Sequence, residues 1–166
     1  KKSRLVFVPI VNPVGVYKGT RSNGNGVDLM RNSPVESIGA TRLYSGQLIS
    51  RRLPWYRGDV ANMEKEARAL CRVVEEQLFA SPLSIALDLH SGFGLKDRLW
   101  FPYASRKTSF PYISQTLALK ELFDRSYRHH VYRIEPMSKE YVINGDLWDY
   151  LLDGFVERVG HDRLFL

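Results

Sequence analysis

Apolar residues along this chain fall into short runs that alternate between the spacing of strands and the spacing of helices. A continuous apolar run from Leu5 to Val11 predicts a strand buried on both faces, and the turn signal at 12–15 ends it. Ser84 to Leu89 alternates between two faces, which predicts a second strand. Shorter apolar stretches at 99–103 and 131–134 predict two more strands.

Three stretches with helical spacing lie between or after these strands. Apolar residues from Val60 to Leu78 recur every three or four positions, which predicts a helix capped by Asp59 and ended by Ser81-Pro82. Ser114 is expected to cap a second helix, which contains Leu117, Leu122, Phe123 and Tyr127. A third is expected from Asp146 to Val159.

The order of these elements predicts one α/β domain. Residues 18–58 carry little periodicity and many glycines and polar residues, which is typical of a long functional loop region. Strands that alternate with helices favour a largely parallel sheet covered by helices, here a single domain over residues 1–166. Both ends of the sequence lie in apolar stretches, so we expect the domain to be incomplete at both ends.

Composition narrows the range of functions. The 166 residues are 44% hydrophobic and 25% charged, as in a folded globular chain rather than a disordered one. The formal net charge is +6, but the basic residues are scattered, so we expect no nucleic-acid partner. No apolar run approaches the roughly 20 residues of a membrane span, and we expect no membrane partner. The single cysteine excludes an internal disulfide and a cysteine-based zinc site and, without a recognisable export signal, favours the cytoplasm.

Three segments contain residues able to carry chemistry. A loop rich in glycine and asparagine holds Arg21 and Arg31, whose guanidinium groups could converge on one anion. His90 follows a predicted strand, at the end where parallel sheets bind ligands. Tyr141 precedes the last predicted helix. From the residues alone, each segment also fits a structural role: a solvated turn, a capped strand end and a helix entry that fills the core.

The order of four motifs along the chain is more specific than any of them alone. They are Asn12-Pro13-x-Gly15, then Arg21-x-Asn23-x-x-Gly26-Val27-Asp28-Leu29-x-Arg31-Asn32, then Asp88-Leu89-His90-Ser91-Gly92, then Tyr141 ahead of Gly145-x-x-x-Asp149. Together they resemble the zinc carboxypeptidases of the carboxypeptidase A type, relatives of succinylglutamate desuccinylase and aspartoacylase. The resemblance implies a three-layer α/β/α fold with a mostly parallel mixed sheet. It also implies a zinc-dependent hydrolase that cleaves an amide bond next to a carboxylate-bearing residue.

The resemblance assigns roles to five residues. It implies zinc as the cofactor, with His90 as one ligand, and zinc with three protein ligands keeps a place for a water of lowered pKa. Arg21 is expected to polarise the scissile carbonyl and to stabilise the oxyanion. Arg31 and Asn32 are expected to bind the terminal carboxylate of a peptide or acyl-amino-acid substrate. Tyr141 is expected to close over the bound substrate and to take part in catalysis.

Two departures from the family pattern leave other functions open. Met30 stands where the family has an asparagine, and a thioether accepts hydrogen bonds weakly and donates none. The family's His-x-x-Glu zinc motif and its later general-base glutamate have no counterpart here, so we expect this chain alone to bind zinc weakly and to be inactive. A non-catalytic carboxylate- or peptide-binding relative and an N-acyl-amino-acid deacylase remain alternatives.

Overall fold

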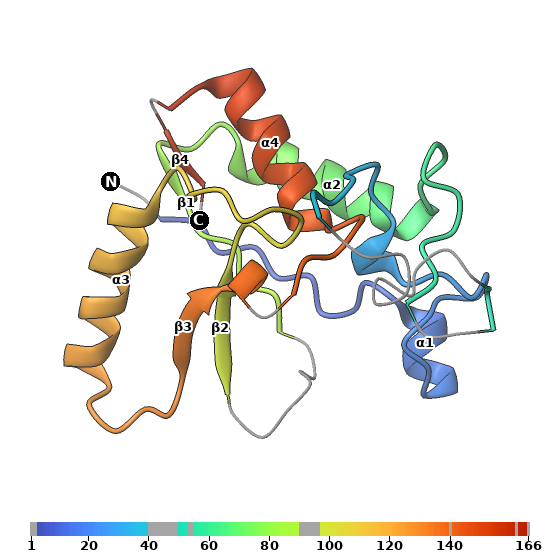
Figure 1. The fold of residues 1–166 in the computed structure, drawn as a ribbon, viewed down its shortest axis with the longest axis horizontal. Helices are drawn as coiled ribbons and strands as arrows, with labels where there is room; N and C mark the ends of the chain where they lie inside the picture. Colours follow the sequence, from blue (N-terminus) through green and yellow to red (C-terminus); the bar gives the residue numbers. More distant parts are fainter. Residues whose placement is uncertain are drawn as a thin grey trace.

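A computed structural model describes residues 3–39, 50–52, 55–89, 97–139, 141–161 and 163–165 (Figure 1). Its helices are α1 (Pro13–Lys18), α2 (Lys65–Leu78), α3 (Ile113–Ser126) and α4 (Leu147–Val159), with short 3-10 turns η1 (Leu29–Arg31) and η2 (Met137–Lys139). Its strands are β1 (Leu83–Ser84), β2 (Arg98–Phe101), β3 (Arg133–Pro136) and β4 (Leu164–Phe165). None of these helices has the length and apolar character needed to cross a membrane.

The strands of the described residues pair in parallel, as an α/β fold requires. β2 pairs with β3, with Arg98 opposite Arg133, and the two strands lie side by side in Figure 1. β1 pairs with β4, with Leu83 opposite Leu164. Both pairs join strands that are separated by a helix in the sequence, which is the arrangement that parallel pairing needs. The predicted α/β class is confirmed, while the three-layer arrangement stays a prediction.

The main hydrophobic core lies where α2 packs against α4 (Figure 1). Buried positions recur at helical spacing along both helices and so face one another: Ala67, Cys71 and Val74 on α2, and Leu147, Leu151, Leu152 and Phe155 on α4. Phe79 and Phe165 extend this core with ring contacts to Phe155, at centroid distances of 5.1 and 5.4 Å. The apolar faces predicted for these two helices are the ones that pack together, so this prediction is confirmed. Burial of apolar surface drives the packing.

The ends of α2 and α4 differ in how well the sequence predicted them. Asp146 caps α4 by accepting a hydrogen bond from Asp149 N at 2.9 Å, and Gly160 ends the helix. The predicted cap of the earlier helix, Asp59, is wrong, because α2 begins at Lys65 with Glu64 in the cap position. The Glu64 side chain makes no capping bond, since its carboxylate accepts hydrogen bonds from the loop at residues 23–25 instead.

One predicted strand does not form in the structure, and another is shortened. Residues 3–10 adopt no strand, and Leu5 and Phe7 are more than four-fifths exposed, at 81% and 82%. The second predicted strand shortens to β1, and Leu87 and Leu89 beyond it are exposed. An apolar run marks residues that favour burial, but a strand forms only where a neighbouring backbone supplies ladder hydrogen bonds. Among the described residues, residues 3–10 have no ladder partner, and the 84–89 segment has one only at Ser84, opposite Phe165.

The turn signal at residues 12–15 begins a short helix, α1, that the apolar pattern did not predict. Asn12 caps it by accepting a hydrogen bond from Gly15 N at 2.8 Å, and Pro13 occupies the first helical position. Gly19 ends the helix in the left-handed conformation, at φ 63°. This compact helix leads directly into the loop that carries Arg21, so its caps fix where that loop begins.

Candidate functional site

Arg21 and Arg31 converge on one carboxylate, that of Asp28. Arg21 Nε lies 2.7 Å from Asp28 Oδ2, and Arg31 Nε lies 3.3 Å from the same oxygen. Asp28 is nearly fully buried and also caps η1, by accepting a hydrogen bond from Met30 N at 3.3 Å. The turn at residues 28–31 therefore brings together two guanidinium groups that stand ten positions apart in the sequence.

The guanidinium of Arg31 is almost buried and yet donates no hydrogen bond to the described residues. Its side chain is only 10% exposed, and its 3.3 Å contact with Asp28 is an ion pair without hydrogen-bond geometry. Burial lowers the pKa of Arg31, and the charge of Asp28 partly opposes this effect. Two guanidinium charges against one carboxylate leave one positive charge in excess, so this cluster can accept a further anion.

Tyr141 lies close enough to Arg31 to influence the pKa of the Arg31 guanidinium. Tyr141 itself reaches solvent and is 45% exposed. The structure therefore brings Arg21, Arg31 and Tyr141 into one neighbourhood. Arg21 is the more open of the two arginines, with 39% of its side chain exposed. An open arginine and an open phenol beside a buried guanidinium form a surface with several hydrogen-bond donors.

Asn32 lies inside the loop rather than at its surface. It is fully buried, its Nδ2 donates to Arg57 O at 2.6 Å, and its Oδ1 accepts from Glu64 N at 2.6 Å. Asn23 links the other end of the loop to the same element, through a 2.9 Å hydrogen bond from its Nδ2 to Glu64 Oε2. Buried polar groups need such partners. Asn32 and Asn23 therefore anchor residues 20–35, which we call the arginine loop, to the start of α2.

Two acidic residues lie buried beneath this surface, at the start of α4. Asp149 accepts hydrogen bonds from Ala104 N at 3.0 Å, Ser105 N at 2.8 Å and Ser105 Oγ at 2.6 Å. Asp146 is buried as the helix cap, and burial first, then the charge of Asp149, raises its pKa to about 7, against the opposing charge of Arg31. Asp146 is therefore mostly protonated below this pH, and in that state it adds no negative charge near Arg31.

His90, the predicted metal ligand, lies outside the described residues. The chain just before it is attached to α4, because Trp148 Nε1 donates to Asp88 Oδ2 at 3.1 Å. Trp148 is the second residue of α4, and the cap of that helix, Asp146, interacts electrostatically with Arg31. The end of the 84–89 segment and the arginine cluster therefore meet the same end of the same helix.

The described residues contain no cluster of three or more histidine, cysteine, aspartate or glutamate side chains able to hold a metal ion. His129 is exposed, His130 Nε2 is 2.8 Å from Asp124 Oδ1, and His161 packs edge-on to Tyr112. The described residues thus do not by themselves fit a zinc ion.

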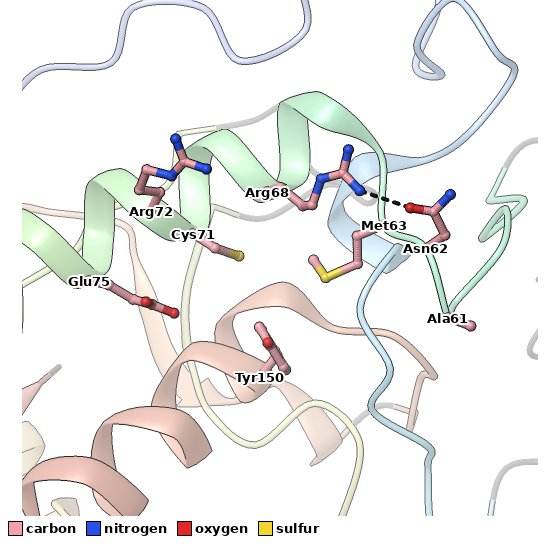
Figure 2. A pocket seen from close by; sticks show the side chains of 8 residues that line it. All are labelled: Ala61, Asn62, Met63, Arg68, Cys71, Arg72, Glu75 and Tyr150. Carbon is pink, nitrogen blue, oxygen red and sulfur yellow. Dashed lines mark hydrogen bonds between the residues drawn. The ribbon is translucent and has the colours of Figure 1, made fainter.

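A separate pocket of about 370 Å³ lies between α2 and α4 (Figure 2). Its lining consists of Ala61, Asn62, Met63, Arg68, Cys71, Arg72, Glu75 and Tyr150. Arg68 is bonded to Asn62 and Glu75 to Arg158, at 2.8 and 2.7 Å. Burial and the charge of Glu75 raise the pKa of Cys71 to about 11, so its thiol is a poor nucleophile at neutral pH. The arginine cluster, and not this pocket, is the better candidate site.

Sequence reasoning singled out Arg21, Arg31 and Tyr141 as site residues but gave no role to two residues that organise them. Asp28 carries a recognisable signal, because an aspartate just before a short turn is a typical cap. Arg57 carries no such signal, since most of its partners are backbone carbonyls, which leave no trace in a side-chain pattern.

Comparison with known proteins indicates a family. The sequence profile described as zinc carboxypeptidase matches residues 1–154, which is nearly the whole chain. No curated protein gives a significant match. The matched range includes the arginine loop, the segment that ends at His90, Tyr141 and most of α4.

Proposed function

This chain belongs to the zinc carboxypeptidase family, and from that membership we propose that it binds the terminal carboxylate of a peptide at Arg31 for hydrolysis of the adjacent amide bond. The family implies a zinc-dependent hydrolase of the metallocarboxypeptidase kind and peptide substrates. The choice of a terminal carboxylate as the recognised group, and the role of each residue, are our proposal.

The state of Arg31 is the observation that carries this proposal. Its guanidinium is almost buried, donates no hydrogen bond to the described residues, and shares its nearest carboxylate with Arg21. A guanidinium binds a carboxylate through two parallel hydrogen bonds, and the bond is stronger where water is excluded. A substrate carboxylate would supply the hydrogen-bond acceptors that Arg31 lacks.

The other residues of the cluster take different parts. Arg21 is held by Asp28 and is partly open, so we assign it to the carbonyl oxygen of the scissile bond, where it would stabilise the developing negative charge. Tyr141 is open to solvent beside Arg31, which suits a side chain that covers the bound substrate. Asn32 is buried with both ends of its amide bonded, so we assign it to the support of the loop rather than to substrate contact.

Zinc and His90 are the remaining parts of the proposal. The family implies that zinc supplies the activated water when it is bound. We assign His90 as a ligand from its place in the family motif and from the tie between Asp88 and Trp148. Zinc titration tests this assignment: His90→Ala should weaken zinc binding by about tenfold or more, and an unchanged affinity would contradict it.

A substrate panel tests the function. We would compare hydrolysis and binding of a free-acid peptide, the same peptide as its C-terminal amide, and a short N-acyl amino acid. The proposal expects binding of the free acid at least about tenfold tighter than that of the amide, and loss of this difference in Arg31→Ala. Equal binding of acid and amide would contradict it. Hydrolysis of the acyl amino acid alone would indicate a deacylase.

A further inference from the structure

Arg57 is a fully buried arginine whose guanidinium is bonded mainly to the backbone of the arginine loop. Its Nε donates to Arg31 O at 3.2 Å, and its Nη2 donates to Ser33 O at 2.9 Å and to Val35 O at 3.1 Å. These three carbonyls belong to alternate residues that begin at Arg31 itself. One side chain therefore fixes the path of the chain directly after Arg31.

Only an arginine side chain has the donors for this arrangement. A guanidinium has five N–H groups in a rigid plane, whereas a lysine has three donors on a single atom. Among the described residues, the charge partner of Arg57 is Glu36, whose Oε1 lies 2.9 Å from Nη1 and whose side chain is 66% exposed. Burying a cation is costly unless it is fully hydrogen-bonded, and here backbone carbonyls supply most of those bonds.

Gly145 packs closely against the same carbonyl. It adopts φ +74°, and a Cβ at this position would lie 1.9 Å from Arg31 O and 2.8 Å from Arg57 Nε. Its backbone is also bonded to the loop, with Ser33 N donating to Gly145 O at 3.2 Å and Gly145 N donating to Val35 O at 2.7 Å. Arg57 and Gly145 therefore both contact the backbone of Arg31.

We propose that Arg57 is a positioning residue, which sets the orientation in which the Arg31 guanidinium receives a carboxylate. This inference rests on the proposed function. Loss of the Arg57 guanidinium removes the donors for the carbonyls of Arg31, Ser33 and Val35, so the loop can turn and the Arg31 guanidinium can rotate toward Asp28. Selectivity for a carboxylate would then fall even in fully folded protein.

The test measures selectivity and loop protection in Arg57→Met and Arg57→Lys. The probes are N-acetyl-leucine and its amide, titrated calorimetrically, and the readout is the ratio of their dissociation constants in folded protein. We expect Arg57→Met to lower this ratio by about tenfold and Arg57→Lys to lower it by about threefold. Hydrogen exchange of the Ser33 and Gly145 amides, measured without ligand, should become faster in both variants.

Two control variants separate positioning from general destabilisation. Arg106→Met removes a different arginine, which is only partly buried and lies outside the arginine loop. Arg106 donates hydrogen bonds of 2.6 and 2.9 Å to Asp153, so its loss should leave the ratio unchanged. Glu36→Gln removes the charge partner of Arg57 but keeps its carbonyl bonds and should also leave the ratio unchanged. If Arg57→Met does not fold, Arg57→Lys decides, and a wild-type ratio in the folded lysine variant overturns the inference.

The outcomes keep this inference apart from the proposed function. If the wild-type protein prefers the acid and the Arg57 variants keep that preference, the inference fails and the proposed function stands. If the wild-type protein shows no preference, the proposed function fails, and hydrogen exchange decides whether Arg57 holds the loop. Exchange at Ser33 and Gly145 no faster than in Arg106→Met would overturn the inference in either case.

Discussion

Replacing Asp146 with asparagine should make the free energy of unfolding less sensitive to a rise in pH. Asp146 is buried, caps α4 through Asp149 N, and has its pKa raised to about 7 by burial and by the charge of Asp149. An asparagine side chain keeps the oxygen that accepts the capping hydrogen bond and has no proton to lose in this range. Asp146→Asn therefore removes the titration without removing the cap.

The direction of the effect follows from linkage. The folded-state pKa of Asp146 lies above its ordinary value of 3.8, so the folded protein holds this proton more tightly than the unfolded chain does. The resulting stability is fully present below about pH 4 and is lost as the pH rises through about 7. The difference of about three pKa units corresponds to about 4 kcal/mol, at about 1.4 kcal/mol per unit.

Urea unfolding of both proteins between about pH 4 and about pH 8 measures this effect. The free energy of unfolding of Asp146→Asn minus that of the wild type should grow steadily with pH, by up to about 4 kcal/mol. Asp153→Asn is the matched control, because Asp153 lies on the same helix, is 41% exposed and pairs with Arg106. A difference that stays constant with pH for Asp146→Asn would refute the assignment of a raised pKa.

Two further substitutions test how the arginine cluster is held. Gly145→Ala should cost about 2–5 kcal/mol in thermal unfolding, from its left-handed backbone and from the close approach to Arg31 O. Gly154→Ala, in an open helical position, should be neutral or stabilising by up to about 1 kcal/mol, and equal losses at both glycines would contradict this. Asp28→Asn should cost about 3 kcal/mol and reduce acid-over-amide selectivity, because Arg21 and Arg31 lose the charge on which they converge; unchanged selectivity would contradict this.

The helix α4 was predicted almost to the residue, because its signals are local. Apolar residues at helical spacing predicted its buried face, Asp146 predicted its start and Gly160 its end. All three follow from residues within one or two turns of each other. Such local signals do not depend on how distant parts of the chain pack.

The strands were harder to predict because their hydrogen bonds join distant parts of the chain. The apolar pattern at residues 5–11 and 84–89 predicts burial, yet neither segment finds a full strand partner among the described residues. β2 and β3 overlap the predicted stretches at 99–103 and 131–134, with β3 shifted to Arg133–Pro136, and each strand supplies the ladder partner of the other. An apolar run thus predicts a preference for burial, and the presence of a partner strand decides whether a strand forms.

The candidate site could be predicted only in part, because some of its contacts also join distant parts of the chain. The convergence of Arg21 and Arg31 on one anion was expected from their side chains, but that anion is the chain's own Asp28. The support from Arg57 was not predicted, because a side chain bonded to backbone carbonyls has no sequence partner to match. The assignment of His90 stays a prediction.

The most direct test of the carboxylate site observes the Arg31 guanidinium itself. Its Nε–H resonance can be assigned by its loss in Arg31→Lys and then followed by NMR while N-acetyl-leucine is added. Because this group is nearly buried and has no hydrogen-bond acceptor among the described residues, the acid should shift its resonance and slow its exchange, and the amide should do neither. An Nε–H signal that does not respond while the acid binds would show that the carboxylate is held elsewhere.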